Sequence, residues 1–342
     1  MIEKNITSFN QSTTAAFPLG RTGLRIVFMG TPEFAVASLD KLVNAGCNIV
    51  GVITAPDKAA GRGLQLQQSA VKQYALQNEL NILQPEKLKN PQFLAELKSL
   101  QADLQIVVAF RMLPQLVWDM PPMGTVNVHG SLLPQYRGAA PINWAIINGE
   151  KETGVTTFKL KHEIDTGDIL MSTIIPIGED ETAGELHDRM KEIGAALLLN
   201  TVNGLTAGNL KEQPQATTIK AVPTAGLQPA LKHAPKIVTE TCQVNWNKPV
   251  QEVYNLVRGL SPYPTAFTFL GGRKLKLYQT EKITAAIGDD QSAVTPAGEF
   301  KTDQKTFLYF ACTDGYLSIK ELQLEGKKKM AIADFLRGYR WQ

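Results

Sequence analysis

Asn127 and His129 are the side chains best suited to chemistry in this sequence. Residues two apart in a strand point to the same face, so their amide and imidazole are expected to project together from an otherwise apolar run. That run ends in a loop that begins at Gly130. A lone histidine at a strand end is more often a structural hydrogen-bonding residue, but the paired asparagine favours a catalytic interpretation.

Asp165 is the third candidate, in a segment of acidic residues and glycine from Glu163 to Asp168. Glycine beside a carboxylate allows the backbone to approach a ligand closely. The alternative is that Asp165 only caps or stabilises a turn. The sequence by itself leaves both interpretations open.

An amide, an imidazole and a carboxylate together suit acyl transfer to an amine. In that reaction the attacking nitrogen gains positive charge while the carbonyl oxygen becomes an oxyanion. Asn127 can donate a hydrogen bond to that oxygen, and a protonated His129 can add positive charge beside it. Asp165 either holds the imidazole in its charged form or relays the amine proton through water. Ser131 is the nearest hydroxyl, but it lacks the Gly-x-Ser-x-Gly turn of a serine hydrolase.

A sheet is needed to position these residues, and the sequence pattern of the N-terminal half predicts one. A strand at 24–29, a helix at 33–45 and a continuous apolar strand at 49–54 form a β-α-β unit. Further elements are expected as strands at 104–109, 125–128, 154–160 and 169–177 and as a helix at 181–202. The pattern predicts an α/β fold with a Rossmann-like doubly wound, mostly parallel sheet, which binds ligands beyond the carboxyl ends of its strands. The turn after Gly30 lacks a G-x-G-x-x-G fingerprint, so dinucleotide binding is not expected.

The C-terminal third has a different pattern. Residues 207–234 are rich in Gly, Pro, Thr and Gln, which indicates a linker, and residues 235–342 alternate short β runs with turns, which predicts a smaller OB-like β-barrel domain. From residue 232 to the end the chain carries 16 Lys and Arg against 11 Asp and Glu, an excess that favours a phosphate-rich partner. A catalytic domain is expected at 24–206. Residues 1–23 do not read as a secretory signal, and are either a disordered leader or lie upstream of the true start.

The overall composition is that of a soluble globular protein, with 44% hydrophobic and 20% charged residues among 342. No apolar run approaches the roughly 18 residues of a membrane-spanning helix, so no membrane partner is expected. Three widely spaced cysteines argue against a disulfide framework and favour a cytoplasmic protein. The remaining histidines have no partners at metal-ligand spacing, so no metal is expected. We expect a monomer.

The segment from Val126 to Ile142, VNVHGSLLPQYRGAAPI, resembles the signature of the 10-formyltetrahydrofolate-dependent formyltransferases, and Asp165–Asp168 resembles its partner motif. The resemblance implies that Asn127, His129 and Asp165 form a catalytic trio and that 10-formyltetrahydrofolate is the formyl donor. It further implies a folate site formed by the turn after the histidine and by backbone after an earlier strand, namely Ser131, Leu132, Leu133, Pro134, Phe110, Arg111 and Met112.

This signature is shared by family members that formylate glycinamide ribonucleotide, amino sugars and methionyl-tRNA, so other segments must identify the acceptor. The segments that are similar to tRNA-directed members are Phe28–Ala35, Pro56–Gly63, Gly259–Pro264, Leu322–Met330 and Asp334–Gly338. The resemblance, which covers residues 24–340, implies formyl transfer to the amino group of methionyl initiator tRNA. It implies tRNA contacts from Arg62 and from Lys327, Lys328 and Lys329.

Two other functions remain open from the sequence. An amino-sugar acceptor would keep the chemistry but leave the basic C-terminal domain without a purpose. A non-catalytic tRNA-binding protein would not need the intact trio. The loop after Gly63 also departs from the family, because it reads LQLQQS where lysines and a proline are frequent, so Arg62 alone is expected to carry its tRNA contact.

Overall fold

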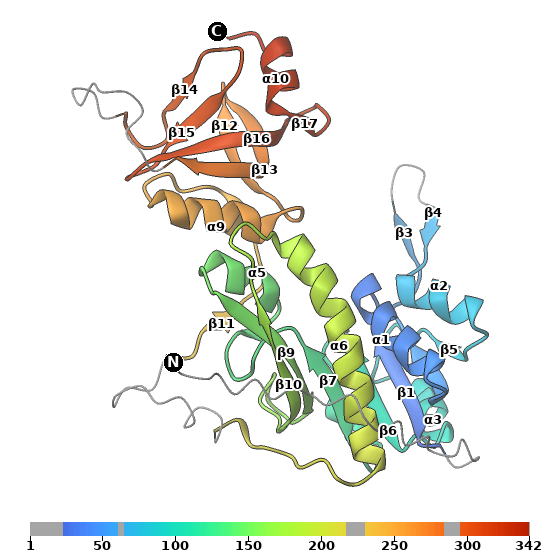
Figure 1. The fold of residues 1–342 in the computed structure, drawn as a ribbon. Helices are drawn as coiled ribbons and strands as arrows, with labels where there is room; N and C mark the ends of the chain where they lie inside the picture. Colours follow the sequence, from blue (N-terminus) through green and yellow to red (C-terminus); the bar gives the residue numbers. More distant parts are fainter. Residues whose placement is uncertain (1–22, 61–64, 217–229, 284–294, 342) are drawn as a thin grey trace, which may run out of the picture.

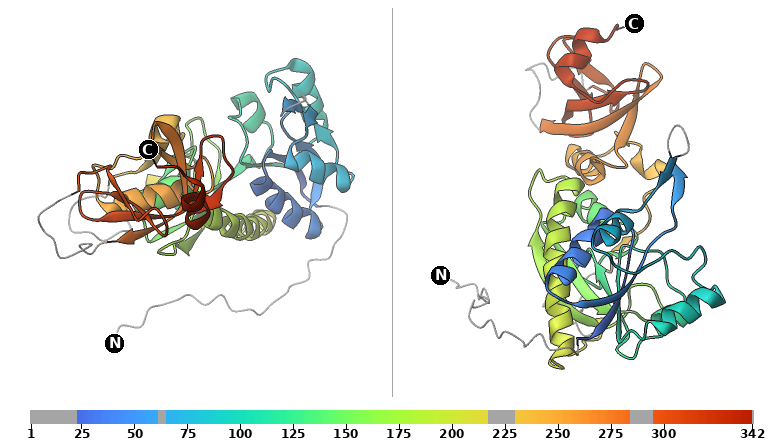
Figure 2. Two further views of the ribbon diagram at one scale, coloured as in Figure 1. Left: turned by 90° about the horizontal axis from the view of Figure 1, so that it is seen from above. Right: turned by 90° about the vertical axis from the view of Figure 1, so that its right-hand side faces the viewer.

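The computed structural model describes residues 23–60, 65–216, 230–283 and 295–341. Figure 1 shows a larger N-terminal part and a smaller C-terminal part stacked on one end of it. The right-hand view of Figure 2 shows the same stacking from another side. No helix in these described ranges combines the length and the apolar character needed to cross a membrane.

The N-terminal part is built on a seven-stranded sheet in the order β10-β9-β7-β6-β1-β2-β5. Its strands are β1 (Arg25–Gly30), β2 (Asn48–Ile53), β5 (Ile82–Leu83), β6 (Leu104–Val108), β7 (Thr125–His129), β9 (Glu152–Lys159) and β10 (Ile169–Pro176). The five strands from β7 to β5 are parallel, and β9 and β10 are added antiparallel at one edge. The strand order reverses between β1 and β6, which is the place where open α/β sheets bind ligands.

Helices cover both faces of this sheet. They are α1 (Glu33–Asn44), α2 (Ala70–Gln77), α3 (Pro91–Ser99), α4 (Gln115–Trp118), α5 (Pro141–Ile147) and α6 (Ala183–Thr206). Ile26 and Phe28 pack in a cluster with residues of α1 and α6, whereas Val27 and Met29 pack in another with residues of α3 and α4. The predicted doubly wound, mostly parallel arrangement is confirmed. It explains why these strands are continuous apolar runs in the sequence.

Helix α6 begins slightly later and ends later than the sequence pattern suggested. Thr182 forms a capping box with Glu185, because the Thr182 hydroxyl accepts from the Glu185 backbone N–H and the Glu185 carboxylate accepts from the Thr182 N–H. This reciprocal pair satisfies two backbone donors that a helix start leaves free. The helix therefore starts at Ala183 and runs 24 residues along one face of the sheet (Figure 1).

A two-stranded hairpin, β3 (Lys58–Ala60) and β4 (Gln65–Gln67), projects from the N-terminal part (Figure 1). Its base is held by Asp57, whose carboxylate accepts a hydrogen bond from Gln84 at 2.9 Å and lies 2.6 Å from Lys72 Nζ. These two bonds lower the pKa of Asp57. Arg62, the predicted tRNA contact, lies outside the described residues.

The C-terminal part is an antiparallel sheet in the order β12-β13-β16-β15-β14, with β17 paired to β16. Its elements are α8 (Thr239–Cys242), α9 (Val250–Leu260), β12 (Ala266–Leu270), β13 (Arg273–Ile283), β14 (Phe300–Thr302), β15 (Leu308–Ala311), β16 (Tyr316–Leu324), β17 (Met330–Ala331) and α10 (Ile332–Gly338). The predicted C-terminal β domain is confirmed. Among the described residues no pairing joins β14 to β12, and the described strands form a curved half-barrel sheet.

Helix α9 joins the two parts, because it packs on α5 and α6 as well as on β13 (Figure 1). Arg258 of α9 is only 6% exposed. Its guanidinium donates to Gly178 O at 3.2 Å and Glu181 O at 3.0 Å, both in the loop between β10 and α6. Burial lowers the pKa of Arg258, so the surrounding carbonyl groups and charges must compensate for its lost hydration.

We expect Arg258→Met to destabilise the protein by about 2 kcal/mol, because the buried side chain would no longer donate its charged hydrogen bonds to Gly178 O and Glu181 O. The measurement is the midpoint of thermal unfolding, which should fall by several degrees. Lys248→Met is the matched control. Lys248 precedes the same helix and its 3.1 Å ion pair with Glu252 is exposed. Equal midpoints for the two variants would show that Arg258 does not join the domains.

Candidate active site

The three predicted catalytic residues come together at the carboxyl end of β7. Val126 and Val128 pack in the core cluster that includes α6, so Asn127 and His129 must lie on the opposite face of the strand. Asp165 reaches the same place from the loop between β9 and β10. The site therefore combines a strand with a loop that is distant in the chain, since Asp165 follows His129 by 36 residues.

His129 is 6% exposed, and its imidazole lies between two oxygen atoms. Its Nε2 is 2.9 Å from the carbonyl oxygen of Tyr136, and its Nδ1 is 3.8 Å from Asp165 Oδ2. The first contact is a hydrogen bond, whereas the second allows charge attraction without a direct bond. With Nε2–H donated to Tyr136, the Nδ1 atom faces the carboxylate and can carry or release a proton there.

Asp165 occupies a tight turn with a left-handed backbone, φ 54°. Its Oδ2 accepts a hydrogen bond of 2.9 Å from the backbone N–H of Gly138, so it ties two loops together as well as facing His129. A Cβ atom at Gly167 would lie 1.5 Å from Lys159 O, so only glycine allows this close approach to β9. The turn-stabilising and charge-positioning interpretations of Asp165 are both compatible with this geometry.

Asn127 is half-buried between Val107 of β6 and Phe158 of β9. Within the described ranges its side-chain amide makes no hydrogen bond. Half-buried amides normally have a protein or water partner. An amide without one, beside His129 on the same strand face, is free to donate to a ligand oxygen.

The polar groups of the loop after His129 form hydrogen bonds within the loop and with Thr156 of β9. The Ser131 hydroxyl donates to Gln135 O at 2.6 Å, Thr156 Oγ1 donates to Ser131 O at 2.7 Å, and the Leu133 N–H donates to Thr156 Oγ1 at 3.2 Å. Ser131, Leu133 and Pro134 are buried, and Leu132 is half-buried. Three of the four predicted folate residues in this turn are therefore buried.

The second predicted folate segment follows β6, which is the neighbour of β7, so both segments lie at the same edge of the sheet. The Arg111 guanidinium donates to Glu86 O at 2.8 Å and to Pro85 O, and lies 5.5 Å from the centre of the Phe110 ring. Burial lowers the pKa of Arg111. Met112 is 74% exposed and therefore offers an apolar surface to a ligand.

The loop that supplies Tyr136 O is held by the chain that leads into the C-terminal domain. β8 (Arg137–Gly138) pairs with β11 (His233–Ala234), and Tyr136 N–H donates to Lys232 O at 2.7 Å. Glu150 accepts from the Tyr136 hydroxyl and lies 2.5 Å from Lys232 Nζ. Burial and the bond to Glu150 raise the pKa of Tyr136. Sequence reasoning missed this role because the segment belongs to the predicted linker.

The predicted tRNA-binding lysines are exposed in the turn between β16 and β17. Lys329 Nζ lies 2.6 Å from Glu321 and 4.9 Å from the centre of the Tyr278 ring. Lys327 and Lys328 form no ion pair within the part of the chain that the structure describes. The three lysines are thus not equivalent as phosphate contacts.

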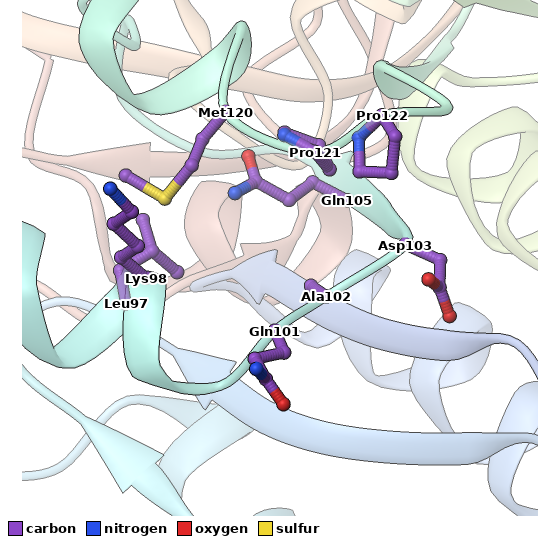
Figure 3. Close-up of a pocket in the computed structure, with 9 residues that line it drawn as sticks. All are labelled: Leu97, Lys98, Gln101, Ala102, Asp103, Gln105, Met120, Pro121 and Pro122. Carbon is purple, nitrogen blue, oxygen red and sulfur yellow. The ribbon is translucent and has the colours of Figure 1, made fainter.

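A cavity of about 320 Å³ lies elsewhere in the N-terminal part (Figure 3). It is lined at the amino end of β6 by Leu97, Lys98, Gln101, Ala102, Asp103, Gln105, Met120, Pro121 and Pro122. Asn127 and His129 are at the carboxyl end of the neighbouring parallel strand, so the cavity does not belong to the candidate active site. The described residues also hold no group of three or more His, Cys, Asp or Glu placed to bind a metal.

Comparisons with known proteins agree with this architecture. A family model described as formyl transferase matches residues 24–202, and one described as formyl transferase, C-terminal domain, matches residues 236–340. Curated proteins named methionyl-tRNA formyltransferase from Parabacteroides distasonis and Phocaeicola vulgatus are 53% and 54% identical to this chain. Each alignment covers 93% of this chain and 96% of the relative.

Solved structures are similar at lower identity and support the fold alone. WlaRD, described as a sugar 3N-formyl transferase, matches with TM-score 0.61 and 20% identity over 90% of this chain and 100% of its own. HypX from Aquifex aeolicus, in complex with tetrahydrofolic acid, matches with TM-score 0.60 and 18% identity over 93% of this chain. This chain spans about half the length of HypX, 48% of it.

Proposed function

The chain belongs to the formyl transferase family and, within it, to the methionyl-tRNA formyltransferases, and from this membership we propose how its residues carry out the reaction. The enzyme transfers the formyl group of 10-formyltetrahydrofolate to the amino group of methionyl-tRNA. A C–N bond forms between that amine and the formyl carbon, the bond from this carbon to the folate nitrogen breaks, and the amine proton passes to the released nitrogen. We propose initiator tRNA as the acceptor.

Asn127, His129 and Asp165 each have a separate role in this step. The Asn127 amide donates a hydrogen bond to the formyl oxygen as it becomes an oxyanion. His129 adds positive charge at the same oxygen, and Asp165, 3.8 Å from its Nδ1, balances that charge or passes on the amine proton through water. The observation that supports these roles is the convergence of the Asn127 amide, a buried imidazole and a carboxylate at one strand end.

The formyl folate is positioned by the two segments that follow β6 and β7. Their chemistry suits a flat, partly polar ligand, because exposed Met112 offers apolar contact and the inward-turned Ser131 to Pro134 loop offers main-chain groups. We place Phe110, Arg111 and Leu132 in the same site. Arg111 acts through its bonds to Pro85 O and Glu86 O, which hold the loop in place.

Each of the two domains is proposed to bind a different substrate. We propose that residues 24–206 bind folate and catalyse, that residues 207–234 connect, and that residues 235–342 form an OB-like barrel that binds tRNA together with Arg62. The curved six-stranded sheet and the basic excess of this region support the last assignment. We further propose a monomer that acts in the cytoplasm without a metal.

The test of the acceptor is formyl transfer from 10-formyltetrahydrofolate to purified methionyl initiator tRNA, with a 4-amino sugar nucleotide in parallel. The sugar is a relevant alternative because a sugar formyl transferase shares the fold. Transfer to the tRNA alone is expected. Transfer to the sugar with an inert tRNA would keep the catalytic trio and overturn the function of the C-terminal domain.

We expect Lys327→Ala with Lys328→Ala to weaken tRNA binding and reduce its salt dependence, by about one unit of log–log slope per lysine. Lys329→Ala is the control, because Glu321 already pairs with that charge and the change in slope should be small. The measurement is the tRNA dissociation constant over a series of salt concentrations. An unchanged slope in the double variant would identify these lysines as a solvated surface only.

A further inference from the structure

Gln215 lies in the predicted linker, yet it is 4% exposed and contacts the catalytic loops. Its Oε1 accepts hydrogen bonds from the Arg137 guanidinium, at 3.1 Å from Nε and 2.5 Å from Nη2. Its Nε2 donates to Asp165 O and to Gly167 O, each at 2.8 Å. One buried amide thus joins the Asp165 turn to the loop that follows His129.

The orientation of this amide has a single solution. Arg137 can only donate, and the two backbone carbonyls can only accept, so a flipped amide would place donor against donor and acceptor against acceptor. Every hydrogen-bonding group of the side chain is occupied, which makes the contact rigid. The backbone supports the placement, because Gln213 and Ile169 exchange two N–H to C=O bonds of 2.8 Å at the start of β10.

The position of Asp165 needs such support. Its backbone is left-handed, a conformation that costs a non-glycine residue free energy, and it persists only where neighbouring contacts hold it. The Asp165 carboxylate is anchored by the Gly138 N–H and the Asp165 carbonyl by Gln215. Gly138 follows Arg137 in the chain. Gln215 therefore bonds to the Asp165 turn and also to the loop whose Gly138 N–H anchors the Asp165 carboxylate.

We infer that Gln215 is a positioning residue for formyl transfer, which holds the carboxylate of Asp165 at its distance from His129. The inference rests on the proposed catalytic role of Asp165. Misplacement of a catalytic group by about 1 Å can cost about a hundredfold in rate, so loss of this amide should act on turnover rather than on substrate affinity.

The main test compares kcat and KM of Gln215→Met with those of the unaltered enzyme. Methionine has a similar length but none of the hydrogen bonds. We expect kcat to fall about 10- to 100-fold, with the KM values for methionyl-tRNA and formyl folate within about twofold. Gln213→Met is the matched control. Gln213 is exposed and its described contacts are made by its backbone, so the kcat of the Gln213→Met enzyme should be unchanged.

A second variant separates the two halves of the amide. Gln215→Glu keeps an acceptor for Arg137 but turns the donor that faces Asp165 O into an acceptor. Its kcat should fall at least as far as that of Gln215→Met. A nearly normal Gln215→Glu enzyme would overturn the inference. If Gln215→Met does not fold, Gln215→Asn, which keeps the amide but is too short to reach all partners, takes its place.

A double-mutant cycle distinguishes positioning from a general structural role. If Gln215 acts through Asp165, then Gln215→Met should cause no further loss of kcat in an Asp165→Asn background, whereas a structural defect would multiply the two losses. Asp165→Asn with full activity would remove the premise and thus the proposed function of Asp165. Unchanged kcat in Gln215→Met, beside an impaired Asp165→Asn, would overturn this inference alone.

Discussion

Replacement of His129 by alanine is expected to lower kcat about a thousandfold while tRNA affinity stays nearly constant. The His129 ring faces Asp165 and lies on the same strand face as Asn127, so its loss removes positive charge at the developing oxyanion and the proton route beside it. Affinity should persist because the proposed tRNA contacts lie on Arg62 and the C-terminal domain. The measurement is single-turnover formyl transfer with saturating substrates, together with tRNA binding.

His162→Ala is the matched control for this variant. His162 is exposed in the loop that carries Asp165, so it reports any effect of removing an imidazole near the turn. Its turnover should remain within about twofold of the unaltered enzyme. Near-normal turnover in His129→Ala would contradict the assignment of His129, whatever the control shows.

Asn127→Ala is expected to lower kcat about a hundredfold, the usual cost of removing one hydrogen-bond donor to an oxyanion. The KM for formyl folate should change little, because the donor matters most once the formyl oxygen is charged. Asn127→Asp should be worse than alanine, since a carboxylate cannot donate and would repel the oxyanion. Steady-state kcat and KM for the two variants measure both effects.

Asn209→Ala provides the comparison, because Asn209 is exposed just after α6. A kcat for Asn127→Ala within about threefold of normal would show that the amide does not contact the reacting oxygen. An equal loss in Asn127→Ala and Asn127→Asp would instead point to a packing role between β6 and β9.

The parallel sheet was predictable because its signals are local. Ile26 and Phe28 alternate with Val27 and Met29, and both sets are apolar because helices cover both faces of the strand. Asn127 and His129 were identified for the same reason: strand periodicity places them on one face. The start of α6 also has a local signal, the capping pair Thr182 and Glu185, although the apolar pattern suggested an earlier beginning.

The C-terminal sheet was predictable only in part. Short β runs indicate strands, but whether a curved sheet closes depends on pairing between strands far apart in the chain, which no local pattern encodes. The described pairings end at β12 and β14. The same limit applies to Lys329, because its pairing with Glu321 arises from strand register and is invisible in a run of three lysines.

The sequence by itself determined the class of fold, since apolar runs and strand periodicity are local. It also supplied three candidate catalytic side chains, and the resemblance of two of its motifs to the formyltransferase signature implied formyl transfer. Only the tertiary structure decided what surrounds them. It places Tyr136 O and Asp165 on either side of His129 and brings Gln215 out of a linker into the site. The physical reason is that hydrogen bonds between distant loops depend on backbone geometry, which residue types along the chain do not specify.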